Sequence, residues 1–291
     1  MPNGTAVDKQ GRLKERAAMS DTNLLLTITI VVFFILYLSA VFFLGGSFTK
    51  PQNFLNILNN NASLIVLSCG MSVVMITGGI DISVGGVTCL VCMTCAVNLE
   101  QQGGNMLTVI LIGLGIGLAF GVVQGFLVAH LGIQPFIVSL AGMFFAKGMT
   151  TIVSKEPVRV TNEGFLAVKD MRINVPGLGA PNKLGVYIPA YVEVGVVVAL
   201  VVVVLLFCLL RWTRLGRAFY AVGGNNQSAN MLGINVRRTK FLAHVLCSVL
   251  AGLGGILYFL HVGSGDVANG AGDEMNAIAS SIIGGTLLTG G

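Results

Sequence analysis

The sequence predicts an all-α fold, a polytopic helical bundle that is integral to a membrane. Apolar residues make up 54% of the 291 residues and charged residues only 10%, whereas soluble domains average about a quarter charged residues. Charge-free windows of about 20 residues, enough for a helix to cross a bilayer, also recur along the chain. The net charge of +5 therefore bears on membrane topology and implies no nucleic acid.

Eight apolar segments are expected as spans. Residues 1–22 precede them and are not a signal peptide, because Asp8 and Glu15 interrupt the basic residues and the apolar run that follows is too long. Residues 23–291 are expected to form the transmembrane domain. Its expected spans are residues 24–44, 54–78 and 82–99, two spans within 101–146 divided at 130–135, and then 190–210, 241–262 and 277–288.

Two polar segments indicate the orientation. Residues 147–187 contain three prolines and mixed charges, so we expect a small extramembrane element there. Residues 211–240 contain six Lys or Arg and no acidic residue. Six spans separate this loop from the basic N-terminus, so both lie on one side, and the positive-inside bias places both in the cytoplasm. Residues 147–187 are then external.

Glycines on the fourth span predict close packing against another helix. They repeat every four residues and so share one face of the helix. They are Gly113, Gly117, Gly121 and Gly125. A nucleotide-binding glycine loop is not expected, because the chain contains no GxxxxGK[ST] motif. No metal site is expected either: Cys89, Cys92 and Cys95 have a suitable spacing, but their neighbours are aliphatic and no fourth ligand stands nearby.

The loop RWTRLGRAFYAVGGNNQSANMLGINVRR, residues 211–238, is more organised than a linker needs to be. It predicts one short helix at residues 217–222, with Phe219, Tyr220 and Val222 as apolar side chains. A second short helix is expected at residues 228–232, after a turn at Gly223 and Gly224. Two short helices that each present an apolar face to water are expected to bind a partner.

The stretch TGGIDISVGG, residues 77–86, holds Asp81, the only charged residue between Lys50 and Glu100. An ionised carboxylate inside a bilayer is costly, so it needs donors or a place near the interface. Three roles stay open: coupling to a proton, lining a transport path, or capping the third span together with Ser83. The glycines favour capping, because they allow a tight reversal. The residues of this helix break are Gly78, Gly79, Asp81, Ser83 and Gly85.

Three motifs resemble those of one family. TRLGRAFYAVGGNNQSANMLGINV looks like the cytoplasmic coupling segment of permease subunits from sugar-importing ABC transporters of the ribose, xylose and galactose group. GGIDISVGG and DEMNAIASSIIGGTLLTGG resemble the family's other signatures, so the resemblance covers about residues 53–291. Residues 135–154, PFIVSLAGMFFAKGMTTIVS, are most similar to the second permease of the galactofuranose importer. Members of the family have further spans after the third motif, so we expect the chain to be truncated at its C-terminus.

The resemblance implies a subunit of a bacterial inner-membrane importer that is not itself an enzyme. A second permease, the same or different, would complete the path within membrane lipid, and a periplasmic or extracellular binding protein would deliver the sugar. Separate ATPase subunits would bind ATP and Mg, leaving this chain without a cofactor. By resemblance, the residues that couple to the ATPase are Arg214, Gly216, Arg217, Tyr220, Ala221, Gly223, Gly224, Asn225 and Gly233.

Three alternatives stay open at this point. Branched-chain amino acid ABC permeases have a similar cytoplasmic segment. A secondary transporter would use an ion gradient, although the single intramembrane acid and the organised basic loop disfavour it. A membrane scaffold or a non-transporting remnant would fit the expected truncation.

Overall fold

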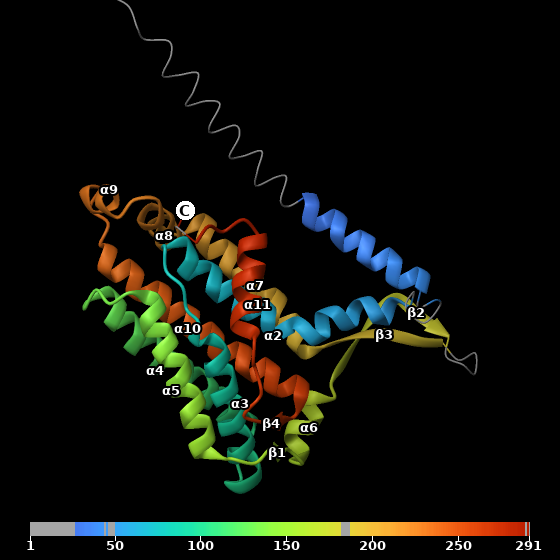
Figure 1. The fold of residues 1–291 in the computed structure, drawn as a ribbon. Helices are drawn as coiled ribbons and strands as arrows, with labels where there is room; N and C mark the ends of the chain where they lie inside the picture. The colour runs from blue at the N-terminus through green and yellow to red at the C-terminus, as the bar shows by residue number, and fades with distance from the viewer. Residues whose placement is uncertain (1–26, 44, 46–49, 182–186, 289, 291) are drawn as a thin grey trace, which may run out of the picture.

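Six long apolar helices form the body of the computed structural model, which describes residues 27–43, 45, 50–181, 187–288 and 290 (Figure 1). Each helix is long and apolar enough to cross a bilayer. They confirm the predicted polytopic all-α bundle. The helices are α2 (Pro51–Ile76), α3 (Ser83–Gln101), α4 (Met106–Ala129), α5 (Pro135–Val153), α7 (Val194–Trp212) and α10 (Val236–Val262).

The predicted count of eight spans is approximate, because the first and last apolar segments differ from the other six. The described part of the first is a shorter apolar helix, Thr27–Phe43, and the rest of residues 24–44 lies outside the described residues. The last is α11 (Asp273–Ile283), which ends at its C-cap Gly284. Eleven residues extend about 16 Å, too short for a bilayer core of about 30 Å.

The polar segment predicted at residues 147–187 begins inside a helix. Residues through Val153 continue α5, where the Thr150 and Thr151 hydroxyls donate to the carbonyls of Ala146 and Lys147 at 2.9 and 3.2 Å. Beyond α5 the chain forms small elements instead of a span. They are β1 (Val158–Arg159), α6 (Glu163–Lys169), β2 (Arg172–Pro181) and β3 (Tyr187–Glu193).

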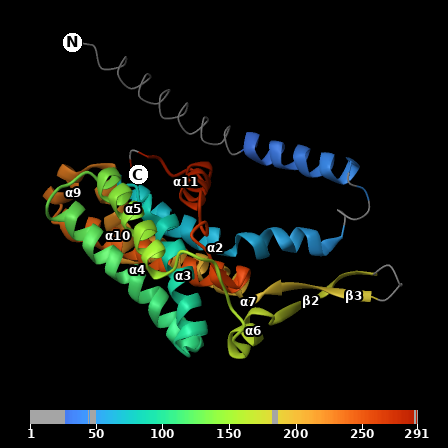
Figure 2. The same cartoon turned by 60° about the horizontal axis from the view of Figure 1, so that its bottom comes forward.

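The short elements mark the two ends of the bundle. Strands β2 and β3 form an antiparallel hairpin with Arg172 opposite Glu193, and β1 pairs with β4 (Ser264–Gly265). We call this the hairpin end. The opposite, basic end carries α8 (Arg214–Gly224) and α9 (Asn226–Met231). Figure 2 shows the hairpin on the side of the bundle opposite to α9, with α4 and α5 packed side by side.

Helix α3 lies inside the bundle and α7 at its surface. In the most apolar window of α3, 83% of the residues are buried, against 17% in α7. The core around α3 is built from side chains of α2, α3 and α10 such as Met71, Val91 and Phe259. Side chains of α7 that are exposed are therefore placed to face lipid, which fits their apolar character.

The glycine face of α4 packs on α10. A Cβ atom added to Gly117 would lie 2.5 Å from the carbonyl oxygen of Ser248, and one added to Gly121 would lie 2.8 Å from the Cα of Val245. Gly113 and Gly125 face α10 in the same way, whereas Gly115 has nothing within 4 Å. The two backbones thus approach at distances that leave no room for side chains.

Candidate functional site

Asp81 lies in the turn between α2 and α3 and is fully buried. Its Oδ1 accepts hydrogen bonds from the backbone N–H and the hydroxyl of Ser83, at 3.0 and 2.6 Å. Its Oδ2 lies 3.4 Å from the donating hydroxyl of Ser248 on α10. The carboxylate thus holds the first residue of α3, as an Asx turn does. The N-cap of α3 is Ile82, which makes no side-chain cap hydrogen bond, so Asp81 bonds the first turn from one residue further out, and its role stays a prediction.

The other break residues shape this turn and its contacts. Gly78 has φ +77°, a left-handed conformation that favours glycine. A Cβ on Gly79 would lie 2.9 Å from Cγ1 of Val74, and one on Gly85 would meet the Glu274 carboxylate. On its other side, the Ser83 hydroxyl accepts from Nε2 of Gln124 on α4 at 2.8 Å. The break is therefore a buried polar centre that joins α3, α4 and α10.

Helix α8 docks on the bundle with one face. Phe219 and Val222 are 0% and 1% exposed and pack on the bundle, whereas Tyr220, the third predicted apolar side chain, is 46% exposed. Side-chain caps fix where α8, α9 and α10 begin: Thr213 Oγ1 accepts from the N–H of Gly216 at 3.1 Å, and Asn225 Oδ1 from Ser228 at 2.9 Å. Asn235 caps α10 in the same manner. The loop is a capped helical platform rather than a linker.

The opposite face of this platform is exposed. It carries Arg214, Arg217 and Tyr220, three of the predicted coupling residues. The structure adds two apolar side chains that the sequence analysis missed, Met231 and Leu232, which are 87% and 78% exposed. No pattern distinguished them from core residues, because a short helix has too few turns to define a buried face. Exposed apolar side chains beside cationic ones are typical of a surface that binds a partner.

The remaining predicted coupling residues set the path of the backbone. A Cβ on Gly216 would lie 2.5 Å from the carbonyl oxygen of Leu209, so glycine permits the tight turn from α7 into α8. Gly233 ends α9 with φ +80°. The others are Ala221, half-buried on α8, Gly223, next to Gly290, Gly224, with nothing within 4 Å, and Asn225, the cap of α9.

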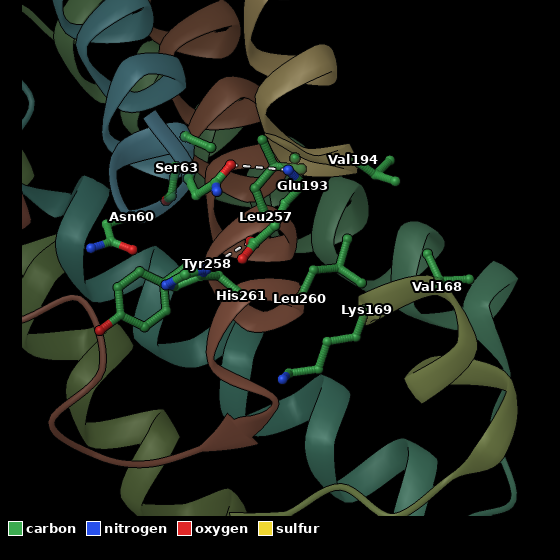
Figure 3. A pocket seen from close by; sticks show the side chains of 13 residues that line it. Asn60, Ser63, Val168, Lys169, Glu193, Val194, Leu257, Tyr258, Leu260 and His261 are labelled. Carbon is green, nitrogen blue, oxygen red and sulfur yellow. Dashed lines mark hydrogen bonds and ion pairs between the residues drawn. The ribbon is translucent and has the colours of Figure 1, made fainter. Parts of the chain in front are cut away.

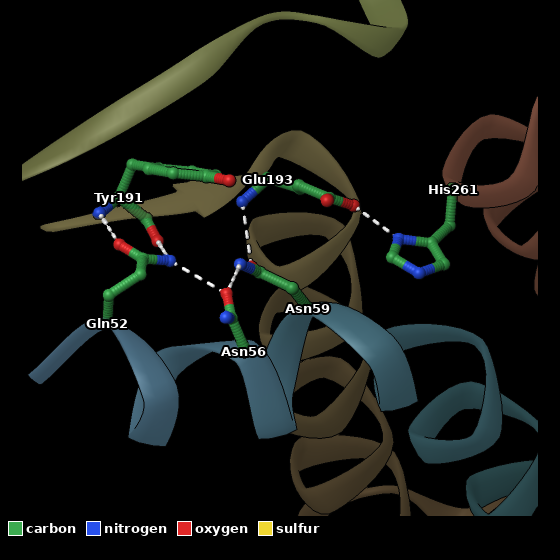
Figure 4. Close-up of polar contacts among 6 residues, drawn as sticks. All are labelled: Gln52, Asn56, Asn59, Tyr191, Glu193 and His261. Carbon is green, nitrogen blue, oxygen red and sulfur yellow. Dashed lines mark hydrogen bonds and ion pairs between the residues drawn. The ribbon is translucent and has the colours of Figure 1, made fainter. Parts of the chain in front are cut away.

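A polar network at the hairpin end joins three elements (Figure 4). The Gln52 side chain on α2 bonds both backbone groups of Tyr191 on β3, at 2.8 and 3.2 Å. Asn59 on α2 accepts from the N–H of Glu193 at 2.9 Å. The Glu193 carboxylate lies 2.8 Å from Nδ1 of His261 on α10. The isolated histidine in the sequence gave no sign of this contact, because its partner is 68 residues away.

Within the described part of the chain, no group of three or more His, Cys, Asp or Glu could hold a metal ion. Cys92 and Cys95 are buried on α3, and their thiols face the carbonyls of Gly255 and Val109 at 3.5 and 3.7 Å. They pack as small apolar side chains.

Comparison with known proteins gives consistent matches. The family model described as "branched-chain amino acid transport system / permease component" matches residues 53–290. The inner membrane ABC transporter permease protein YjfF of Escherichia coli K12 is 36% identical over 94% of this chain and 79% of its own length. The fructose import permease FruG of Bifidobacterium longum is 32% identical, covering 99% and 83%, and the ribose import permease RbsC of E. coli K12 is 36% identical, covering 85% and 74%.

No solved structure matches the chain significantly. The family model spans the body of the bundle, the Asp81 break and the α8–α9 platform. The chain therefore belongs to the permease-component family of ABC transport systems and is a multi-pass protein of the inner membrane.

Proposed function

We propose that the chain is the membrane-spanning permease subunit of an ATP-binding-cassette importer for a monosaccharide. The family description names branched-chain amino acids. The relatives that match most of the chain, however, include fructose and ribose import permeases. We therefore favour a sugar over a branched-chain amino acid. Galactofuranose is our specific candidate, because residues 135–154, most of which form α5, resemble the second permease of that importer.

The α8–α9 platform carries this proposal. Phe219 anchors α8 in the core, while Arg217 and Met231 face outward. A helix held on one side by the bundle and open on the other suits the transfer of movement from a partner to the spans. We propose that the partner is the ATPase subunit, which binds ATP and Mg, and that its docking surface is apolar with acidic groups that match the arginines.

An ATPase on the α8–α9 platform also fixes the orientation of the chain in the membrane. The basic end and residues 1–22 are then cytoplasmic, although residues 1–22 lie outside the described residues. The hairpin end is external and receives the sugar-binding protein. We propose that a second, different permease completes the path, as the resemblance of α5 implies. We also assign Asp81 a structural role, because its carboxylate already accepts from three donors, which disfavours proton coupling.

The test is co-purification of the tagged chain with its candidate ATPase. Met231→Asp and Arg217→Glu alter exposed side chains, so they should lose the ATPase while the chain still folds. The control Arg159→Glu makes the same charge reversal at an exposed arginine of the hairpin end and should keep the ATPase. If the wild type retains no ATPase, the proposed docking of the ATPase on the α8–α9 platform is wrong. Competition of labelled ribose, fructose, galactofuranose and leucine for uptake then separates sugar from amino acid transport.

A further inference from the structure

Helix α11 crosses α2 (Figure 1). The side chains at this crossing form a polar seam in the apolar surface. The hydroxyls of Ser68 and Ser280 are 2.6 Å apart, and Ser72 donates to Ser281 at 3.1 Å. Asn276 lies one turn before Ser280 on α11, and both are exposed. We define the seam as Ser68, Ser72, Asn276, Ser280 and Ser281.

The seam differs from the surface of α7, which belongs to the same bundle. The exposed side chains of α7 are apolar, among them Leu200, Val204 and Leu205 at 50–63% exposure. Such a surface suits lipid. Polar side chains within membrane-spanning structure face water or protein instead. The seam is therefore placed to line an aqueous route or the contact with another subunit.

Two buried oxygen atoms without partners lie where α11 begins. They are Oγ1 of Thr88 on α3 and Oε2 of Glu274 on α11, in residues that are 0% and 8% exposed. Both residues adjoin the contact between Gly85 and Gly270. A buried polar atom without a partner is destabilising, so a ligand whose hydroxyl groups hydrogen-bond to it would relieve this cost. The start of a short helix inside the membrane is also where transporters hold substrates.

Other contacts of the chain lie on either side of the seam, toward the two ends of the bundle. At the hairpin end, Asn60 and Tyr258 line a pocket together with Lys169 and His261 (Figure 3). At the basic end, Gly290 rests against Gly223 of α8, since a Cβ on Gly290 would lie 2.7 Å from the Gly223 carbonyl oxygen. The start of α11 and the seam thus lie along one helix, between the pocket of the hairpin end and α8 of the basic end.

We propose that the seam and the start of α11 line the route of the sugar, with Glu274 and Thr88 as an intramembrane binding point for its hydroxyl groups. The inference rests on the proposed function and adds the residues that contact the substrate. Serine hydroxyls and the asparagine amide both donate and accept, as sugar hydroxyls do. The seam has no net charge, which suits an uncharged ligand, and the Glu274 carboxylate can accept from two adjacent hydroxyls.

The first test asks whether water reaches the seam. Ser280→Cys and Val204→Cys are each introduced into the complete importer in membrane vesicles, and the introduced thiol is treated with a charged methanethiosulfonate. Modification requires thiolate, which lipid suppresses, so we expect Ser280→Cys to react at least about tenfold faster. Mass spectrometry of the labelled peptide measures both rates. Equal rates would overturn the proposed route.

The second test measures uptake of labelled ribose, fructose and galactofuranose. Ser280→Leu should lower uptake of the transported sugar about tenfold or more, the effect of a lost hydrogen bond and added bulk. Ser280→Thr, which keeps the hydroxyl, should recover part of the uptake that Ser280→Leu loses. Val204→Leu on α7 should transport normally, and all variants should retain the ATPase. Normal uptake by Ser280→Leu would overturn the route. If even the wild type takes up no sugar, the proposed function fails, and the thiol rates alone decide whether the seam is an aqueous route.

Discussion

Two helix contacts in this bundle are made in opposite ways. Helix α4 meets α10 through glycines, so that their backbones lie closer than side chains would permit. Helix α2 meets α11 through serine hydroxyls, at a seam where Asn276 and Ser280 remain exposed. The first contact excludes water and fixes two spans relative to each other. The second offers hydrogen bonds to a ligand, so the two contacts separate the stability of the bundle from its transport function.

The largest effect is expected at the glycine contact. Gly117→Leu would place a side chain against the Ser248 carbonyl, whereas Gly115→Leu on the same helix meets open space. Because backbone cannot give way as a side chain can, Gly117→Leu should cost about 1–3 kcal/mol or more of stability. Thermal unfolding in detergent measures the difference. Equal melting temperatures for the two variants would show that the contact does not hold the bundle.

Asp81, like the glycine contact of α4 with α10, is expected to stabilise the bundle. Its replacement should have the second-largest effect on stability. In Asp81→Leu the buried N–H and hydroxyl of Ser83 lose their acceptor, which should cost about 1–3 kcal/mol of stability. Asp81→Asn keeps an accepting oxygen and should retain folded protein and part of the uptake. Yield of monodisperse protein and uptake are measured together. Full uptake by the leucine variant would contradict a structural role.

Substitutions near the contact between α2 and α11 should lower uptake and leave stability unchanged. Thr88→Val removes a hydroxyl that has no partner in the protein and keeps the side-chain volume. The melting temperature should therefore hold or rise, while uptake falls about tenfold, equivalent to about 1.4 kcal/mol. A variant that melts lower and transports normally would assign Thr88 to packing.

The smallest effect is expected for the ion pair of Glu193 and His261, which belongs to neither contact. Their side chains are 28% and 34% exposed, and ion pairs this accessible contribute below about 1 kcal/mol. A double-mutant cycle with Glu193→Gln and His261→Gln measures the coupling, which should decrease further in high salt. A coupling above about 2 kcal/mol would mean that the hairpin end is latched more firmly than its exposure predicts.

Much of the fold could be predicted from the sequence because hydrocarbon thickness sets the length of a crossing helix. Six expected spans correspond to long apolar helices. The half-length of α11 could not be predicted, since an average over residues 277–288 does not register that Gly284 ends the helix. Lys147 likewise marked the start of a polar segment in the sequence, yet it continues α5, because one charge with a long apolar stem does not end a helix.

In the candidate sites, too, local patterns could be predicted from the sequence, whereas contacts between distant residues could not. The four-residue spacing of Gly113 to Gly125 predicted a common face, but only the structure identifies α10 as its partner. Phe219 and Val222 were predicted as the apolar face of the loop and are buried. The pairing of Ser68 with Ser280 could not be predicted, because the contact joins residues 212 positions apart and serines carry no periodic signal.

Helix α10 gives the molecule a mechanical constraint. Its 27 residues make a rod of about 40 Å, which reaches from the cap at Asn235 beside α9 to His261 beside Glu193. The glycine contact binds α4 along the side of this rod. A displacement of the first turn of α10 must therefore also displace its C-terminal end, together with α4. Movement at the basic end of the bundle is then coupled to movement at the hairpin end.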